Sequence, residues 1–498
     1  MSRDVKTGLK RRAVLGGIAS LVANAAAGEA VTRSLRPVAR PVADLKPSSA
    51  QGELSSLIEA AGLTGTVGAA LMDAETGALI EGYNASSRLP PASVAKAITA
   101  QFALETLGPD YRFTTRLLAT GGVQDGAIQG DLILVGGGDP VLTTDDLAEA
   151  ARRLKEAGIR EVKGQFLVWD GALPYQAQID AEQMAHLGYN PAMSGLNLNF
   201  NRVHFEWVRE NGDYKVTMDA RSPHFRPDVS VSRMRIETRD WPVYTFANGE
   251  GYDEWTVARG ALGQGGARWL PVRRPALYAG DVFRTFARSN GIVLKVAQKA
   301  GDLPYGDELV RLSSPSLSEI VSDMLKYSVN LTAEVLGLTA SATRNSHIRT
   351  LTQSGREMGQ WLLREHALVA QLVDHSGLGD DSRVSARTMA SFMASGSAST
   401  MLRPLLKPVP IRGTDGRAIP NHPVEVVAKT GTLNFVSTLS GFVRTANGED
   451  RSFAIFAADL DKRELAKRSQ DEVPRGARSW ARKARNLQQE LLKRWGAL

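Results

Sequence analysis

The 498-residue chain is long enough for two or three domains, and its 43% hydrophobic and 23% charged residues are typical of a folded globular protein. It has no cysteine, which excludes disulfides, thiolate catalysis and cysteine-ligated metals. The net charge of +7 does not indicate a nucleic-acid partner, because residues 1–47 hold nine of the 60 Lys and Arg against three of the 53 Asp and Glu, which leaves the remainder nearly neutral.

The N-terminus has the pattern of an export signal. Lys10, Arg11 and Arg12 precede a short apolar stretch, residues 13–27, that ends in small residues. We therefore expect a signal peptide over residues 1–27, a linker over 28–47 and a periplasmic location, reached by the Sec or the twin-arginine route. A frayed basic tail is the alternative. No apolar run reaches the roughly 18 residues that a membrane span needs.

The first regular elements lead up to Ser93. β-like runs at 66–72 and 78–80 flank a turn-forming segment, which predicts a β-hairpin. Pro90 and Pro91 then precede Ser93, and proline just ahead of a helix is a start signal. We expect a helix from Ser93 to Leu107 with Ser93 at its N-terminus.

Residues 112–302 differ in composition and pattern from the flanking sequence. Short β-like runs at 132–135, 216–218 and 229–231 alternate with many glycines and turn residues. This pattern predicts one or two inserted β-rich domains. Helical periodicity returns at 317–338 and 351–367.

The C-terminal part predicts strands at 424–429, 436–444 and 452–457, followed by a last helix. The apolar residues of that helix fall on one face, which favours packing on a sheet. Its basic outer face could instead touch an anionic membrane. The apolar face holds Trp480, Ala484, Leu487, Leu491 and Trp495, and the basic face holds Arg478, Arg482, Lys483 and Arg485.

Ser93 and Lys96 form an S-x-x-K motif on the predicted helix. Residues three apart share a helical face, so the lysine amine can reach the serine hydroxyl. A lysine removes that proton only when it is neutral, which requires a pKa lowered by burial or by a nearby cation. We therefore expect Ser93 as nucleophile and Lys96 as its general base. The motif alone is weak, since about one S-x-x-K is expected by chance in a chain of this length.

Ser328 and Asn330 form an S-x-N motif. A second hydroxyl can pass a proton from the base to a leaving amine, and an asparagine side chain can both donate to and accept from a peptide substrate. Taken alone, the tripeptide is more simply the end of a helical turn.

Residues 429–432 (KTGT) are the strongest signal, since a chance K-T-G is expected only about 0.1 times in such a chain. We expect them at a strand end beside the site. Lys429, Thr430 and Thr432 can bind a free carboxylate, while Gly431 has no side chain to block a substrate backbone. The N–H groups of Thr432 and Ser93 would form an oxyanion hole. The charge of Lys429 would also lower the pKa of the base.

These motifs and three further segments resemble the D-alanyl-D-alanine carboxypeptidase/endopeptidase family, the class-C low-molecular-mass penicillin-binding proteins. The segments are residues 130–140 (GDLILVGGGDP), 190–201 (NPAMSGLNLNFN) and 374–378 (DHSGL). The 235 positions from Ser93 to Ser328 are similar to the large insertion for which this family is known. The resemblance covers residues 50–460.

The resemblance implies an α/β (α+β) transpeptidase-like or β-lactamase-like domain, with an antiparallel sheet flanked by helices. We place it at residues 48–111 and 303–498, interrupted by two β-rich inserted domains over 112–302. It implies cleavage of the terminal D-Ala, or of D-Ala–diaminopimelate cross-bridges, in peptidoglycan stem peptides. It also implies acylation of Ser93 by β-lactams, and no metal or other cofactor.

Two other functions stay open from the sequence. One is a β-lactamase or esterase on the same scaffold, and the other is a non-catalytic cell-wall binding protein that keeps the fold. The joint presence of both hydroxyls, both amines and the asparagine argues against the second. A homodimer and peripheral membrane contact are both compatible with the sequence, whereas nucleic acid is not expected.

Overall fold

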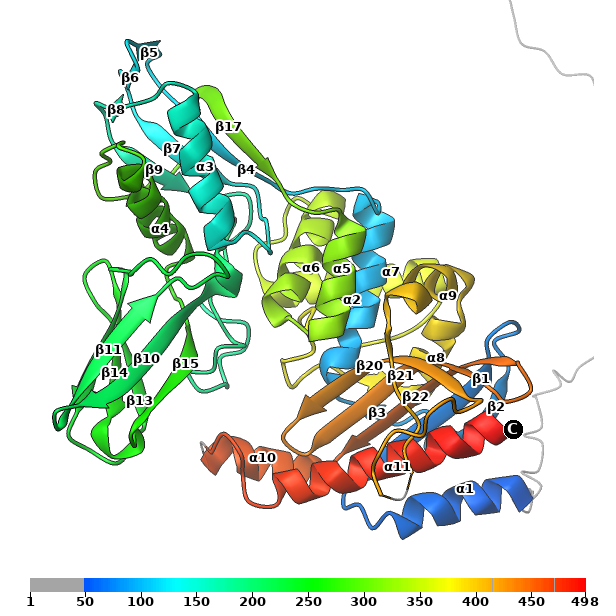
Figure 1. The fold of residues 1–498 in the computed structure, drawn as a ribbon. Helices are drawn as coiled ribbons and strands as arrows, with labels where there is room; N and C mark the ends of the chain where they lie inside the picture. The colour runs from blue at the N-terminus through cyan, green and yellow to red at the C-terminus, as the bar shows by residue number, and fades with distance from the viewer. Residues whose placement is uncertain (1–48, 414, 470) are drawn as a thin grey trace, which may run out of the picture. The chain divides into compact units, whose positions relative to one another are not determined.

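The computed structural model describes residues 49–413, 415–469 and 471–498 (Figure 1). The predicted signal peptide, residues 1–27, and linker, residues 28–47, lie outside the described residues. Within the described ranges, no helix combines the length and apolar character that crossing a membrane demands.

An antiparallel sheet of six strands joins the two ends of the described chain, in the order β19-β20-β21-β22-β1-β2. The predicted N-terminal hairpin and the three C-terminal strands are confirmed. The strand that carries Lys429 runs on to Leu433, so the K-T-G motif lies inside a strand rather than at its end as expected. The strands are β1 (Thr66–Asp73), β2 (Leu79–Tyr83), β19 (Lys407–Pro408), β20 (Glu425–Leu433), β21 (Val436–Arg444) and β22 (Asp450–Ala458).

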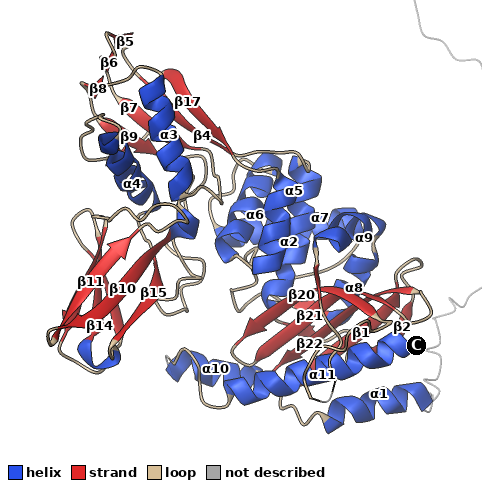
Figure 2. Ribbon diagram, viewed as in Figure 1, coloured by secondary structure: helices blue, strands red, loops and turns tan. Residues whose placement is uncertain are grey.

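Side chains alternate along these strands, so each face of the sheet receives its own helical layer (Figure 2). Ala69 and Leu71 of β1 pack with α1 (Ser49–Ala60) and α11 (Ala477–Ala497), whereas Ala70 and Met72 pack with α8 (Ala386–Ala394) and the helices beyond it. The predicted apolar face of the last helix is buried against the sheet, as expected. α10 (Leu460–Ser469) connects β22 to α11.

A helical layer lies on the α8 side of the sheet, around the nearly fully buried α2. A short 3-10 turn, η1 (Ala92–Val94), precedes α2, so Ser93 lies in that turn and not in the α-helix itself. The predicted helix end at Leu107 is confirmed. The helices are α2 (Ala95–Leu107), α5 (Leu317–Tyr327), α6 (Asn330–Arg344), α7 (Leu351–His366) and α9 (Gly396–Leu402), and the strands β3 (Arg88–Leu89) and β18 (Val384–Ser385) pair nearby.

Between α2 and α5 the chain forms β-rich units with their own core. A five-stranded sheet, β16-β9-β7-β4-β17, packs against α3 and α4, and two three-stranded sheets follow, β11-β10-β15 and β12-β14-β13. The elements are β4 (Thr114–Ala119), β5 (Val123–Gln124), β6 (Ala127–Ile128), β7 (Leu132–Gly136), α3 (Thr144–Glu156), β8 (Glu161–Val162), β9 (Phe166–Trp169), η2 (Asn199–Asn201), β10 (Arg202–Glu210), β11 (Asp213–Asp219), β12 (Ser232–Glu237), β13 (Tyr244–Asn248), β14 (Asp253–Ala258), η3 (Arg259–Ala261), β15 (Gly265–Pro271), α4 (Pro275–Ser289), β16 (Gln298–Lys299) and β17 (Asp307–Ser313).

This region departs from the sequence-based expectation in three details. It carries two helices besides its strands, and β17 pairs with β4 although it follows residue 302. The β-like run at 229–231 is not a strand, because β12 begins at Ser232. The boundaries proposed for the inserted domains stay predictions.

Candidate active site

Three separate segments bring the predicted site residues together. Ser93 and Lys96 come from η1 and α2, Ser328 and Asn330 from the junction of α5 and α6, and residues 429–432 from β20. Lys96 Nζ lies 3.0 Å from Ser93 Oγ and donates to Asn330 Oδ1 at 2.7 Å. The eight residues predicted from the motifs therefore converge on one place in the fold.

The Ser328 hydroxyl belongs to the same network. It accepts a hydrogen bond from Lys429 Nζ at 2.9 Å. The Ser328 backbone is left-handed, with φ of 60°, and this ends α5 and allows α6 to start at Asn330. The helical periodicity at 317–338 runs across this point and did not reveal the break, whereas the S-x-N tripeptide taken alone suggested the end of a helical turn, as observed.

Gly431 allows the K-T-G strand to lie against the turn that holds the nucleophile. A Cβ atom at this position would lie 2.8 Å from Ser93 N and 2.2 Å from Thr438 Oγ1. Thr438 Oγ1 in turn donates to Pro91 O at 2.8 Å, which fixes the turn to β21. In the same strand, Thr430 is half-buried and Thr432 is exposed.

Lys96 is fully buried, and its amine has a third partner, Ser376 O, at 2.8 Å. Burial lowers its pKa to about 8, against the opposing charges of Glu334 and Asp374. Burial, which the sequence analysis named beside a nearby cation, is the largest cause, ahead of any contribution from Lys429. A pKa near 8 makes the neutral form accessible close to neutral pH.

Lys429 is also buried, and the proximity of the two lysines acts mainly on this one. Its pKa falls to about 6 because of burial, with the charges of Lys96 and Lys407 adding to the effect. Its amine donates to Thr430 O at 2.7 Å besides Ser328 Oγ. An anion bound beside this amine would favour its charged form again.

The sequence analysis did not identify the buried carboxylate of Glu334, which lies behind Lys96. Glu334 accepts from the backbone N–H groups of His375 at 3.0 Å and Ser376 at 2.8 Å, and so holds the segment whose carbonyl receives Lys96. Burial and, next to it, the charge of Asp374 raise its pKa to about 8. The available signal was an acidic residue inside the apolar run of α6, residues 331–338.

The segment 374–378, which carried part of the family resemblance, contributes through its backbone. Asp374 accepts from Gly377 N at 3.0 Å and from Gly379 N at 2.7 Å, and burial raises its pKa. His375 is buried with Nε2 at 2.6 Å from Ser354 Oγ, and burial lowers its pKa to about 3. The low pKa keeps this histidine neutral, and its contact with Ser354 joins the segment to α7.

The inserted region reaches the site through Tyr189. Its carbonyl oxygen accepts from Asn330 Nδ2 at 3.0 Å, so both ends of the Asn330 amide are engaged. A cavity of about 620 Å³ opens here, lined by Ser93, Ser328, Asn330 and Thr432 and, on another side, by residues of α10 and α11.

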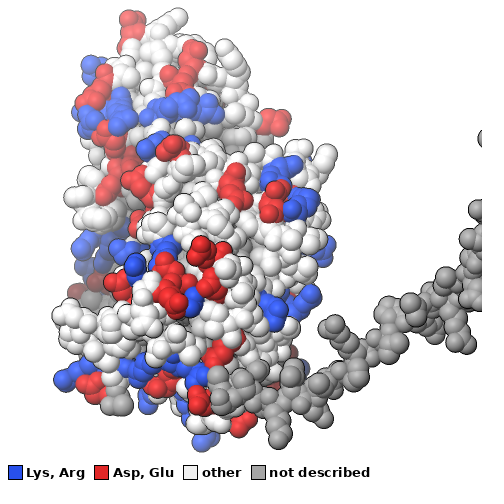
Figure 3. All heavy atoms as spheres, turned by 90° about the vertical axis from the view of Figure 1, so that its right-hand side faces the viewer, with Lys and Arg blue, Asp and Glu red and all other residues white. Residues whose placement is uncertain are grey.

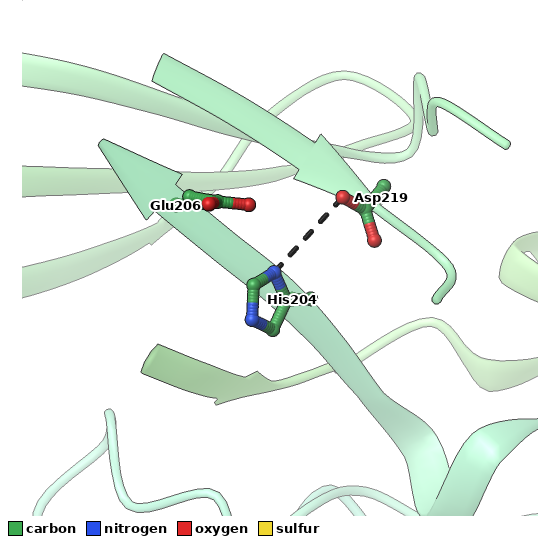
Figure 4. A group of neighbouring side chains, drawn as sticks. All are labelled: His204, Glu206 and Asp219. Atoms are coloured by element: carbon green, nitrogen blue, oxygen red, sulfur yellow. Dashed lines mark ion pairs between the residues drawn. The ribbon is translucent and has the colours of Figure 1, made fainter. Parts of the chain in front are cut away.

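A second group of titratable side chains lies in the inserted region and could hold a metal (Figure 4). His204 and Glu206 of β10 face Asp219 of β11, with candidate ligand atoms within 4.8 Å of one another. The Arg221 guanidinium already donates to Glu206 Oε2 at 2.6 Å and to Asp219 Oδ2 at 2.9 Å. The donor set is thus neutralised by this chain's own cation and fits a metal poorly. The expectation of catalysis without a cofactor stays a prediction.

Comparisons with known proteins identify relatives of this chain. The D-Ala-D-Ala carboxypeptidase 3 (S13) family matches residues 50–477. A D-alanyl-D-alanine carboxypeptidase of Actinomadura sp. (strain R39) is 28% identical over 455 residues, which are 80% of this chain and 79% of that protein. The D-alanyl-D-alanine carboxypeptidase DacB of Haemophilus influenzae is 25% identical, over 76% of this chain and 82% of that protein.

Solved structures show the same fold. Penicillin binding protein 4 of Haemophilus influenzae superimposes with a TM-score of 0.72 at 22% identity, over 88% of this chain and 99% of that one. Its complex with a β-lactam gives a TM-score of 0.68 at 23% identity, with the same coverage. The predicted fold class, a transpeptidase-like α/β domain with inserted domains, is confirmed. With a family match across most of its length, the chain belongs to the D-Ala-D-Ala carboxypeptidase 3 (S13) family.

Proposed function

We propose that this chain cleaves peptide bonds between two D-amino acids in peptidoglycan stem peptides through an acyl-enzyme on Ser93. The observation that carries the proposal is the buried Lys96 amine, which lies 3.0 Å from Ser93 Oγ and is held by two further acceptors. A neutral amine has two N–H groups and one lone pair. When the N–H groups donate to Asn330 Oδ1 and Ser376 O, the lone pair is left for the Ser93 hydroxyl.

The acylation step follows from this arrangement. Lys96 takes the Ser93 proton as the oxygen attacks the carbonyl carbon, and the developing oxyanion accepts from the N–H groups of Ser93 and Thr432. Ser328 passes a proton to the departing amine. Water then hydrolyses the ester on Ser93 and restores the free hydroxyl.

Lys429, Thr430 and Thr432 bind the carboxylate at the C-terminal end of the substrate. β19 pairs with β20 only at Val427 and Ala428, so the edge from Lys429 onward has no strand partner within the described sheet. A peptide can lie along that edge with its backbone opposite Gly431. The Asn330 Nδ2 group, which donates to Tyr189 O in this structure, is the donor that a substrate carbonyl would engage instead.

We extend the proposal to location and partners. The chain acts in the periplasm after removal of residues 1–27, on either a terminal D-Ala or a D-Ala–diaminopimelate cross-bridge, and β-lactams acylate Ser93 in the same way. On the face drawn in Figure 3, acidic and basic side chains are interspersed, which gives no support for a nucleic-acid partner. A homodimer and peripheral membrane contact stay predictions.

The test combines covalent capture with product analysis. Labelled penicillin should modify the wild-type protein, with the modified peptide containing Ser93, and the protein should release D-Ala or cleave cross-linked muropeptides, as read from product masses. Ser93→Ala should do neither, whereas Ser318→Ala, a change of the same size on the half-exposed surface of α5, should behave as wild type.

Other outcomes separate the rival functions. Rapid turnover of penicillin without muropeptide cleavage would assign the site to a β-lactamase or esterase. Absence of both capture and cleavage in the wild-type protein would favour a non-catalytic binding protein. Wild-type rates in Ser93→Ala would refute the assignment of the nucleophile.

A further inference from the structure

Three arginines of the basic face of α11, for which the sequence analysis considered contact with an anionic membrane, line the active-site cavity. Arg478, Arg482 and Arg485 all border the cavity of about 620 Å³ that also contains Ser93. They lie at positions i, i+4 and i+7 of the helix, so they form one row. The opposite side of α11, including Trp480 and Leu487, is buried against the sheet, which fixes the rotation of the row toward the cavity.

These three arginines have no anionic partner among the residues that the structure describes. All three are exposed, and none forms an ion pair or hydrogen bond there. The other charged residues that line the cavity already have partners of opposite charge. Arg463 Nε donates to Asp380 Oδ1 at 2.7 Å, and Glu472 pairs with His186 at 2.6 Å and with Arg268 at 2.8 Å.

The position of the row along β20 indicates which part of a substrate it would meet. In the proposed complex the terminal carboxylate lies at Lys429 and the attacked carbonyl lies between Ser93 and Thr432. The rest of the peptide, on the amino-terminal side of the scissile bond, continues past Leu433 and Asn434. Those two residues line the same cavity as the arginine row.

We propose that Arg478, Arg482 and Arg485 form a subsite for a carboxylate on the acyl-donor part of the substrate, so that the enzyme selects acidic peptides. This inference rests on the proposed function. Guanidinium groups bind carboxylates through two parallel N–H donors, and the row can do so without breaking any contact made by the described residues. The neighbouring Lys483 does not belong to the subsite, since its amine donates to Gly62 O at 3.1 Å, away from the cavity.

The experiment uses the full chain and two peptides that end in D-Ala-D-Ala. They differ only at the residue before this pair, which carries a free side-chain carboxylate in one peptide and the corresponding carboxamide in the other. The wild-type protein should cleave the acid with the higher kcat/KM, mainly through a lower KM. This preference should fall as NaCl is raised, because salt screens exposed charges.

Arg482→Gln should reduce the acid-to-amide ratio of kcat/KM by about tenfold, as expected for loss of a charge-assisted contact at an exposed site. The triple change of Arg478, Arg482 and Arg485 to Gln should bring the ratio close to one. Lys483→Gln is the matched control, with the same helix and the same change of charge, and should keep the wild-type ratio. Thermal unfolding of each variant checks that the fold is retained.

An unchanged ratio in the triple variant overturns the proposal. If that variant instead loses binding to vesicles of anionic phospholipid, while vesicles of neutral phospholipid bind neither protein, the row is a membrane contact. A wild-type protein that cleaves both peptides equally refutes the subsite and leaves the proposed function intact. A wild-type protein that cleaves neither peptide and captures no labelled penicillin refutes the proposed function itself.

Discussion

The two buried lysines predict a bell-shaped dependence of activity on pH. The productive site needs a neutral Lys96 to accept the Ser93 proton and a charged Lys429 to bind the substrate carboxylate, so the pair must hold one proton in total. The pKa values of about 8 for Lys96 and about 6 for Lys429 place that single-proton state between pH 6 and pH 8. We therefore expect kcat/KM for a D-Ala-D-Ala peptide to be highest in this interval.

The same pKa values show that substrate binding is needed to move the proton from Lys96 to Lys429. In the free site the single proton resides on Lys96, and moving it to Lys429 costs about 3 kcal/mol, the equivalent of the roughly hundredfold difference between the two affinities for a proton. A carboxylate about 4 Å from the Lys429 amine contributes about 4 kcal/mol at an effective dielectric constant of about 20. Binding of the terminal carboxylate is therefore sufficient to charge Lys429 and release Lys96 as a base.

The number of protons on the two lysine amines determines how kcat/KM changes on the acidic and alkaline sides of the pH profile. Below about pH 6 both amines are protonated, so no base is present and kcat/KM falls about tenfold per pH unit. Above about pH 8 both are neutral, so no cation holds the carboxylate and kcat/KM falls again by about tenfold per pH unit.

The assay is D-Ala release measured from pH 5 to pH 10, with a matched substrate whose terminal carboxylate is a methyl ester. The ester gives Lys429 no anion to bind, so its profile should rise with pH and then level off, without the alkaline decrease. An acid substrate whose kcat/KM keeps rising above pH 9 would contradict the required charge on Lys429. An ester with the same alkaline decrease as the acid would assign that limb to another group.

Three substitutions test other parts of the geometry. Ser328→Ala removes the proposed proton relay and should lower kcat about 10²-fold, with muropeptide binding retained in an equilibrium assay. Gly431→Ala places a methyl group 2.8 Å from the nucleophile's N–H and should slow acylation by labelled penicillin about 10²- to 10³-fold, unless that N–H is not part of the oxyanion hole. Gly337→Ala places a Cβ 2.0 Å from the His375 ring and should destabilise the fold by about 1–3 kcal/mol, seen as a lower Tm, whereas Gly396→Ala in α9 meets no atom within 4 Å and should leave the Tm unchanged or higher.

Features encoded by nearby residues were predictable. The β-like runs at 66–72 and 436–444 predicted strands that the structure confirms, and the apolar spacing from Trp480 to Trp495 predicted the buried face of α11. Ser93 and Lys96 could be paired because three residues of helical turn bring their side chains to one face. In each case the spacing along the chain already sets the direction of the side chain.

Contacts made through the backbone could not be found in this way. Lys96 donates to the carbonyl of Ser376, and Asn330 donates to the carbonyl of Tyr189. Because every residue carries a backbone carbonyl, the residue type does not indicate which carbonyl makes such a contact. The S-x-N tripeptide suggested the end of a helical turn, but nothing in it specifies the left-handed backbone that Ser328 adopts there.

The sequence by itself determined which chemical groups are available: two hydroxyls, two amines, an amide and a glycine, in an order that identifies the family. Only the tertiary structure decided their protonation and their partners. Burial, which the sequence analysis named beside repulsion from a nearby cation, is the largest cause of the lowered pKa of the base. The rotation of α11 places three exposed arginines along the cavity that also contains Ser93. Both outcomes depend on which segments pack together and exclude water from their contact. Those segments lie up to hundreds of residues apart in the chain, so their packing cannot be derived from local sequence.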